Sequence, residues 1–258
     1  MLYSKPYHLD DLIRYNSSYA SFSYSKLNYI ISKSEAYSFQ QENLEKERKE
    51  YKTALTYSAS YSQKENVAVT YYFTPKIFLK PTRLFTPIIN AAQEIHELIE
   101  KTFNLMFGKS LPENISIKIC SEEELRQMHS KFGLWNNNIQ GFALNGKHKK
   151  IFVKSNNLDA LMSVIGHEIG HVYTHCLSNA HDEEAKAFSF SFEWMRIIKE
   201  HNIGNIAENI KDNFDFSPAK NGLHDIAFLF VKSLINNGLK PMGVHWDLVK
   251  GYTSIFTF

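Results

Sequence analysis

The segment VIGHEIGHVYTH (164–175) carries two histidines four residues apart, His167 and His171, with Glu168 directly after the first. On a helix, residues i and i+4 lie on one face, about 6 Å apart along the axis. Two imidazoles so placed can bind one zinc ion through bonds of roughly 2.0–2.1 Å. Glu168 would then project beside the metal, where it can take a proton from a zinc-bound water. The spacing therefore predicts a hydrolytic zinc site with Glu168 as its general base.

Two histidines leave such a zinc site one protein ligand short, and an acidic cluster downstream supplies candidates. Asp182, Glu183 and Glu184 follow His181 at the start of a second predicted helix. We favour Glu184 as the third ligand, because apolar residues follow it at the spacing of one helix face. Glu183 is the second choice and Asp182 the third, since acidic side chains also favour the positive end of a helix without binding metal. His181 is a further alternative.

Two glycines inside the motif helix need an explanation. Gly166 and Gly170 each cost about 1 kcal/mol relative to alanine in a helix. We expect the close approach of a strand or of a substrate backbone to offset this cost.

Other polar residues are candidates for supporting roles. His175 lies one further turn along the predicted helix, too far to share the metal, and is expected to pack or to support the ligands. Two histidines and two tyrosines could stabilise the oxyanion of a tetrahedral intermediate: His224, His245, Tyr173 and Tyr252. Cys176 is expected to be buried.

Composition limits the other classes of function. The chain has 258 residues, 43% hydrophobic and 22% charged, with a net charge of +2. Scattered basic residues and near-neutral charge argue against a nucleic-acid partner. There is no signal-peptide pattern and no apolar run of about 18 residues, so no membrane span is expected. Two unclustered cysteines suit a reducing compartment, which predicts a cytoplasmic protein. The oligomeric state is left open.

Composition changes near residue 80, because twelve of the fourteen tyrosines precede Phe73. We predict an N-terminal Tyr/Ser-rich appendage over residues 1–80 and a domain over residues 81–258, with its core at about 88–200. The periodicity of apolar residues predicts helices at 35–57, 88–107, 158 to about 177, 182–201 and 223–235, and strands at 67–73, 115–120, 141–144 and 150–154.

The motif His167-Glu-Ile-Gly-His171, with His175 and the acidic-Ala-x-x-Phe helix after it, resembles the gluzincin metallopeptidases. Within them the chain is most similar to the ImmA/IrrE type and to the small minigluzincins. The resemblance implies an α+β, zincin-like fold. In that fold a short twisted mixed sheet lies against an active-site helix, and a glutamate helix follows. The rest of the chain would form a mostly helical C-terminal tail.

The resemblance also implies zinc-dependent hydrolysis of peptide bonds, with one Zn2+ per chain and a peptide or protein substrate. An edge strand before the active-site helix would pair with the substrate backbone. Two segments match that strand, Gly141–Leu144 and Ile151–Val153, and within the first the expected binding residues are Gly141, Phe142 and Ala143. The alternative is a catalytically silent, peptidase-like zinc protein that acts as a binding or regulatory module.

Overall fold

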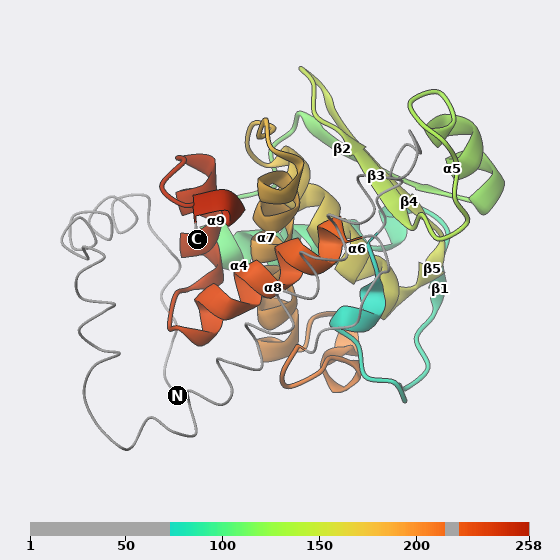
Figure 1. Ribbon diagram of the computed structural model, residues 1–258. Helices are drawn as coiled ribbons and strands as arrows, with labels where there is room; N and C mark the ends of the chain where they lie inside the picture. The colour runs from blue at the N-terminus through green and yellow to red at the C-terminus, as the bar shows by residue number, and fades with distance from the viewer. Residues whose placement is uncertain (1–72, 215–221, 258) are drawn as a thin grey trace.

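The computed structural model describes residues 73–214 and 222–257. Within these ranges the chain forms an α+β fold with six α-helices and two small sheets (Figure 1). The helix predicted at 35–57 and the strand predicted at 67–73, apart from Phe73, lie outside the described residues. No helix in the described ranges is long and apolar enough to cross a membrane.

The larger sheet has three strands in the order β2-β4-β3. The central strand β4 pairs in parallel with β2 and antiparallel with β3. A separate two-stranded ribbon joins β1 to β5. The bounds of these strands are Ile88–Ile89 for β1, Ile115–Cys120 for β2, Gly141–Leu144 for β3, Lys149–Lys154 for β4 and Asn156–Asn157 for β5.

Helix α7 lies at the centre of the helical layer. It packs against α6 on one side and against α8 and α9 on the other (Figure 1). Helix α6 in turn lies between α7 and the sheet, against β3 and β4. The bounds of the helices are His96–Phe107 for α4, Glu122–His129 for α5, Leu158–Val172 for α6, Ala180–Glu200 for α7, Leu223–Asn236 for α8 and Pro241–Val249 for α9.

Local sequence signals account for several of these boundaries. The predicted strand at 115–120 is confirmed, and α5 begins directly after it at the N-cap Ser121. The Ser121 hydroxyl accepts from the Glu124 N–H (3.2 Å), and the Glu124 carboxylate accepts from the Ser121 N–H (2.8 Å). This reciprocal pair satisfies two backbone donors that the helix leaves open. Gly108, with φ at 68°, ends α4 as expected.

The prediction of one helix at 88–107 is wrong in its first half. Ile88 and Ile89 form β1, which pairs with β5, and a short 3-10 turn follows at Ala92–Glu94 before α4 begins. The backbone of Ile89 thus finds its partners in a strand that precedes α6. Tertiary pairing therefore overrides a helical pattern of apolar residues.

The two glycines of α6 face α7. A Cβ at Gly166 would overlap the ring of Trp194, and one at Gly170 would lie 2.8 Å from the Cα of Ala187. The prediction that a strand or a substrate backbone approaches these glycines is therefore wrong, because the close neighbour is α7. Without these two side chains, the helices approach closely along the face that carries the histidines.

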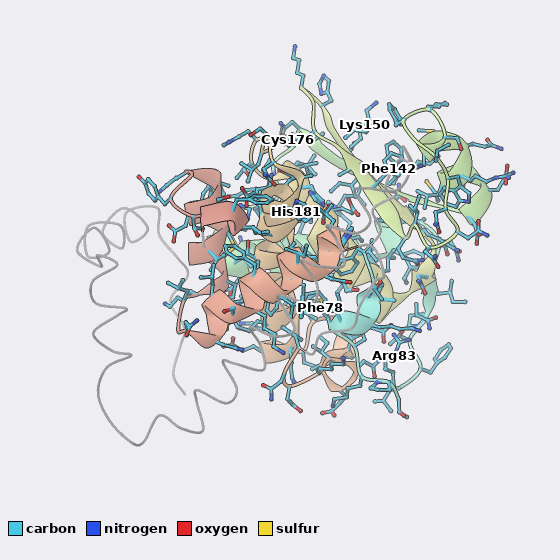
Figure 2. All side chains as sticks on the ribbon, viewed as in Figure 1. Phe78, Arg83, Phe142, Lys150, Cys176 and His181 are labelled. Atoms are coloured by element: carbon cyan, nitrogen blue, oxygen red, sulfur yellow. The ribbon has the colours of Figure 1, made fainter. Side chains whose placement is uncertain are left out.

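Helix α6 ends at Val172, earlier than the predicted position near residue 177. His175 and Cys176 lie beyond its end and are exposed, so the expectation of a buried Cys176 is wrong (Figure 2). Side chains satisfy the last carbonyls of the helix. The buried Lys186 ammonium donates to the His171 carbonyl (3.0 Å) and the His175 carbonyl (2.8 Å). Asn145 also donates to the His171 carbonyl (3.1 Å).

Strand β3 lies at the edge of the sheet, whereas β4 is paired on both sides. The alternative placement of an edge strand at Ile151–Val153 is therefore wrong. The Lys154 N–H donates to the Gln140 carbonyl (2.8 Å), which makes this a hydrogen-bonded pair of the antiparallel ladder. Because such pairs alternate with non-hydrogen-bonded ones, the backbone groups of Gly141 and Ala143 point away from β4, toward the open edge.

Residues 73–79 contribute to the same hydrophobic core as the helices, through Phe73, Ile77, Phe78 and Leu79. Leu79 forms an isolated bridge with Ile210, the residue after a short 3-10 turn at Ala207–Asn209. This part of the core lies against α6 and α7, so the segment before residue 80 helps to cover the helices that carry the motif.

Replacing Gly170 by alanine should destabilise the protein even though alanine favours helices. The gain in propensity is about 1 kcal/mol, and overpacking against Ala187 costs about 1–3 kcal/mol or more. Gly243 in α9 is the matched control, because a Cβ there meets no atom within 4 Å. Urea unfolding should show a lower free energy of unfolding for Gly170→Ala and an unchanged or higher one for Gly243→Ala. A Gly170→Ala variant as stable as the wild type would contradict the helix contact.

Candidate metal centre

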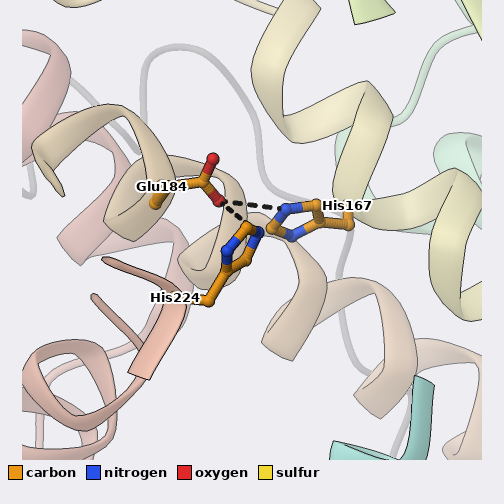
Figure 3. Close-up of side chains that lie close together, drawn as sticks. All are labelled: His167, Glu184 and His224. Carbon is orange, nitrogen blue, oxygen red and sulfur yellow. Dashed lines mark ion pairs between the residues drawn. The ribbon is translucent and has the colours of Figure 1, made fainter. Parts of the chain in front are cut away.

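Four side chains from three helices meet between α6, α7 and α8. His167 and His171 come from α6, Glu184 from the second turn of α7, and His224 from the first turn of α8. Figure 3 shows the rings of His167 and His224 directed at the Glu184 carboxylate. His167, His224 and Glu184 are buried, with exposed fractions of 1%, 3% and 7%, and His171 is partly buried.

The distances between the polar atoms match those between ligands of one metal ion. His167 Nε2 lies 3.3 Å from Glu184 Oε2 and 3.3 Å from His171 Nε2. His224 Nε2 lies 3.1 Å from Glu184 Oε2, and His171 Nε2 lies 3.7 Å from Glu184 Oε1. In a tetrahedral site with bonds of about 2.0–2.1 Å, neighbouring ligand atoms are about 3.3–3.4 Å apart. The buried trio of His167, Glu184 and His224 could therefore hold a metal ion.

Hydrogen bonds on the far side of two rings direct their lone pairs inward. Ser191 donates its hydroxyl proton to the Ala187 carbonyl (2.8 Å), so its oxygen can accept from His167 Nδ1 (3.3 Å). His171 Nδ1 lies 2.9 Å from Glu183 Oε1 and donates to it. With a proton on Nδ1, each neutral ring presents an unprotonated Nε2 to the cluster. Such outer partners are what orient metal-binding histidines.

The inner side of the cluster brings a buried carboxylate oxygen and imidazole nitrogens together. Among the described residues, Glu184 Oε2 is buried without a hydrogen-bond partner, although two imidazole nitrogens lie within 3.3 Å of it. A buried carboxylate oxygen beside inward lone pairs is unfavourable unless a positive charge lies between them. Imidazole and carboxylate are ligands that zinc accepts. The residues present therefore fit a divalent cation.

Protons are the alternative source of positive charge. Burial lowers the pKa of His171, but the nearby carboxylates of Glu184, Glu183 and Glu168 raise it to about 9. Burial lowers the pKa of His167 to about 3. Burial would raise the pKa of Glu184, yet His224 and His171 hold it well below its usual range. Without a cation the cluster would hold a protonated His171 beside a neutral His167, and metal analysis distinguishes these two states.

Glu168 is buried beside the cluster, with an exposed fraction of 4%. Burial raises its pKa to about 7, with an opposing influence from His171 and a reinforcing one from Glu184. Among the described residues its carboxylate has no ion pair with a histidine, whereas Glu183 pairs with His171 and Glu184 with His167 and His224. It is thus the one carboxylate of the group held near the cluster and not committed to a histidine.

The structure places the other acidic candidates outside the cluster. Glu183 accepts from His171 Nδ1, from the Leu177 N–H (2.7 Å) and from Lys186 (2.9 Å). Asp182 accepts from the Ser254 hydroxyl (2.8 Å) and the Ile255 N–H. Glu184 alone of the three carboxylates reaches both His167 and His171 at the cluster's inner side.

The remaining candidate side chains also lie elsewhere. The ring of His181 packs against Phe256 (5.4 Å). Buried His245 has its Nδ1 3.1 Å from the Lys186 carbonyl. Tyr173 packs against Phe103 and other rings, and Tyr252 is exposed.

Sequence reasoning considered His224 for oxyanion stabilisation and missed its position among the metal-binding atoms. No spacing motif marks it, because 40 residues and two helix ends separate it from Glu184. The signal in the sequence is limited to a histidine in the first turn of a largely apolar helix, α8. Its ring lies 5.8 Å from the rings of both His167 and Phe188.

Aromatic rings cover the cluster. Phe73 stacks on His167 with ring centroids 4.4 Å apart, and Phe188 lies 4.9 Å from the same ring. Phe73 also lines a cavity of about 630 Å³, together with Gln140 before β3 and Asn156 of β5. None of the four cluster residues lines that cavity. Phe73 therefore contacts both the His167 ring and this cavity.

Comparison with protein-family models, with curated proteins and with solved structures found no match to this chain.

The two neighbouring glutamates should affect metal binding differently. Glu184→Gln should reduce Zn2+ binding to below one per chain at micromolar metal, because it removes a cluster carboxylate. Glu183→Gln should retain one Zn2+ per chain with an affinity about 10- to 100-fold lower, as for partners that only orient a ligand. Competition with a chromophoric chelator measures both. Equal losses for the two variants, or a greater loss for Glu183→Gln, would exclude Glu184 as the ligand.

Proposed function

We propose that this protein is a zinc-dependent metallopeptidase that hydrolyses peptide bonds. The observation that supports the proposal is the convergence of His167, His171 and Glu184 at ligand spacing, with Glu168 buried beside them. Glu168 follows the first histidine directly, so the turn of α6 that presents a ligand also places a carboxylate next to it. A structural zinc site has no need of such an additional carboxylate.

The zinc ion, when bound, would lower the pKa of a water molecule to about 7 and polarise the substrate carbonyl. The role we assign to Glu168 is to accept the proton from the attacking water and to return it to the leaving amine. Burial suits this role, because a carboxylate with few water contacts holds a proton more readily than an exposed one. Ser191 hydrogen-bonds to the His167 ring and Glu183 to the His171 ring, which limits rotation of both rings.

We infer that the substrate backbone binds along β3. Gly141 and Ala143 present N–H and C=O groups to the open edge, where a peptide can add as a further strand. A side chain at Gly141 would crowd Val164 of α6 (2.9 Å), so this end of β3 lies directly against the motif helix. Phe142 lies between Gly141 and Ala143 and pairs with Phe152 of β4. Its ring packs on the Phe152 ring, with centroids 5.0 Å apart, and so stabilises the sheet.

A second candidate function is a zinc-bearing binding or regulatory protein without turnover. The specific observation in its favour is that His224 joins His167 and Glu184 in a buried trio at ligand spacing, beside the partly buried His171. Sites with four protein ligands are characteristically structural, whereas catalytic zinc keeps one position open.

Zinc content is the first quantity to determine. The purified chain should contain about one Zn2+ after dialysis against metal-free buffer, measured by elemental analysis. No bound zinc, even after refolding with added metal, would overturn both candidate functions and favour the protonated cluster.

Glu168→Gln should abolish peptide hydrolysis while zinc content stays at the wild-type level. The amide keeps the volume of the side chain but cannot accept a proton, and loss of a general base lowers the rate by about 10²–10⁴-fold. Cleavage of a denatured-protein mixture, followed by mass spectrometry, supplies the assay. Turnover within a few-fold of wild type in the variant would exclude Glu168 as the base.

Ala143→Pro should lower kcat/KM by roughly 2- to 10-fold, the equivalent of one hydrogen bond of about 0.5–1.5 kcal/mol. Proline removes the N–H at the open edge and leaves the pairing with β4 intact, as edge positions tolerate. Ala143→Gly is the control, since it keeps the N–H and should retain kcat/KM. If the proline variant cleaves peptides as well as the control, the substrate does not pair at this position.

A further inference from the structure

We propose that His224 is a fourth, displaceable ligand of the metal, so that the conformation described here is a closed resting state. The inference rests on the metal site of the proposed function, though not on peptide hydrolysis. It assigns a coordinating role to a helix, α8, that lies outside the motif and the glutamate helix.

The distances from His224 Nε2 to the other polar atoms place it among the metal ligands. His224 Nε2 lies 3.1 Å from Glu184 Oε2, and His167 Nε2 lies 3.3 Å from the same oxygen. All the donor atoms of this trio lie within 4.8 Å of one another. A donor to a substrate oxyanion must instead stand about 2.7–3.1 Å from an oxygen that is itself bound to the metal. The spacing leaves no room for that oxygen between His224 and the other ligands.

The contact is also buried. Glu184 Oε2 lies 3.1 Å from His224 Nε2 and 3.3 Å from His167 Nε2, and all three side chains are buried. A carboxylate enclosed by two imidazoles from different helices is favourable when positive charge lies among them, and a shared divalent cation supplies that charge.

Packing of α8 and the backbone at Gly222 determine the position of the His224 ring. Leu223, Ile226 and Phe228 are buried, so packing holds the helix in place. The residue before it, Gly222, has a φ of 63° and ψ of −46°, a conformation that residues with a side chain rarely adopt. The Ile226 N–H donates to the Gly222 carbonyl (3.0 Å), and the N-cap supplies no side-chain hydrogen bond. A small rotation at Gly222 would move the first turn of α8, and with it His224, away from the metal.

The consequence is a latent enzyme. Four protein ligands leave no position for water, and hydrolysis needs one. Release of His224 would leave His167, His171 and Glu184 as the ligands of an open site. The same departure would make space beside Glu168.

The test uses Co2+ as the metal probe in the full-length protein. Replacing a nitrogen ligand of Co2+ by a water oxygen changes the position and the intensity of its visible absorption bands. His224→Ala should therefore show a band that is shifted and weaker than the band of the wild type. His245→Ala is the matched control, because it removes a buried histidine outside the cluster, and it should keep the wild-type band. Circular dichroism verifies that each variant is folded.

His224→Cys provides a second and independent readout, should the alanine variant fail to fold. A thiolate within bonding distance of Co2+ adds a charge-transfer band in the near ultraviolet. Its presence supports the proposal. Its absence in a folded, cobalt-loaded variant overturns it, as does an unchanged visible band in His224→Ala.

Peptide cleavage by the zinc-loaded proteins separates this proposal from the proposed function. Faster cleavage by His224→Ala than by wild type supports both. A weakened cobalt band with no cleavage by either protein supports coordination by His224 and overturns the peptidase. An unchanged cobalt band together with a loss of cleavage in His224→Ala would assign His224 to catalysis and overturn coordination.

Discussion

The close packing of α6 on α7 is the constraint on which the rest of this structure depends. Gly166 and Gly170 remove the two side chains that would keep the helices apart, so the backbone of Ala187 and the ring of Trp194 lie directly against α6. A larger separation would move Glu184 out of reach of the histidines. The cost of two glycines in a helix, about 2 kcal/mol in all, is offset by that contact and by the burial of Trp194, whose indole N–H donates to the Met162 carbonyl (2.9 Å).

Hydrogen bonds between polar groups at this helix contact fix the side chains of the site. The end of α6 meets the start of α7, where Lys186 is fully buried and donates to the His171 carbonyl of α6 and to the His175 carbonyl just beyond it. The same ammonium pairs with Glu183, which accepts from His171 Nδ1. A cation is favourable at the C-terminal end of a helix. One chain of hydrogen bonds therefore ends α6 and also fixes the tautomer of a ring that faces the cluster.

The cluster is buried, and this enclosure opposes the access that a catalytic function would require. Phe73 and Phe188 both pack against the ring of His167, and His224 Nε2 lies 3.1 Å from Glu184. This arrangement strengthens electrostatic interactions, because few waters screen them. It also denies access to a substrate. The chemistry suggested by Glu168 and the enclosure of the site are compatible if the aromatic cover and the first turn of α8 move.

The sequence by itself determined the local chemistry. The H-E-x-x-H spacing places two rings on one helix face whatever the fold, the capping box at Ser121 starts α5, and the alternation of apolar and polar residues predicts β2. These are short-range effects that act within a few residues. The favoured Glu184 also followed from helical periodicity, although nothing local could separate its role from that of Glu183.

Only the tertiary structure decided the partners of these elements. Gly166 and Gly170 signalled a close approach, but α7 as the approaching element depends on how two helices pack. The early end of α6 depends on Lys186 and Asn145, which reach its carbonyls from distant elements. The place of His224 depends on the fold of the C-terminal helices, since residues 40 positions apart meet only through long-range packing. Such contacts join residues far apart in the sequence and follow no periodicity, so the sequence pattern does not predict them.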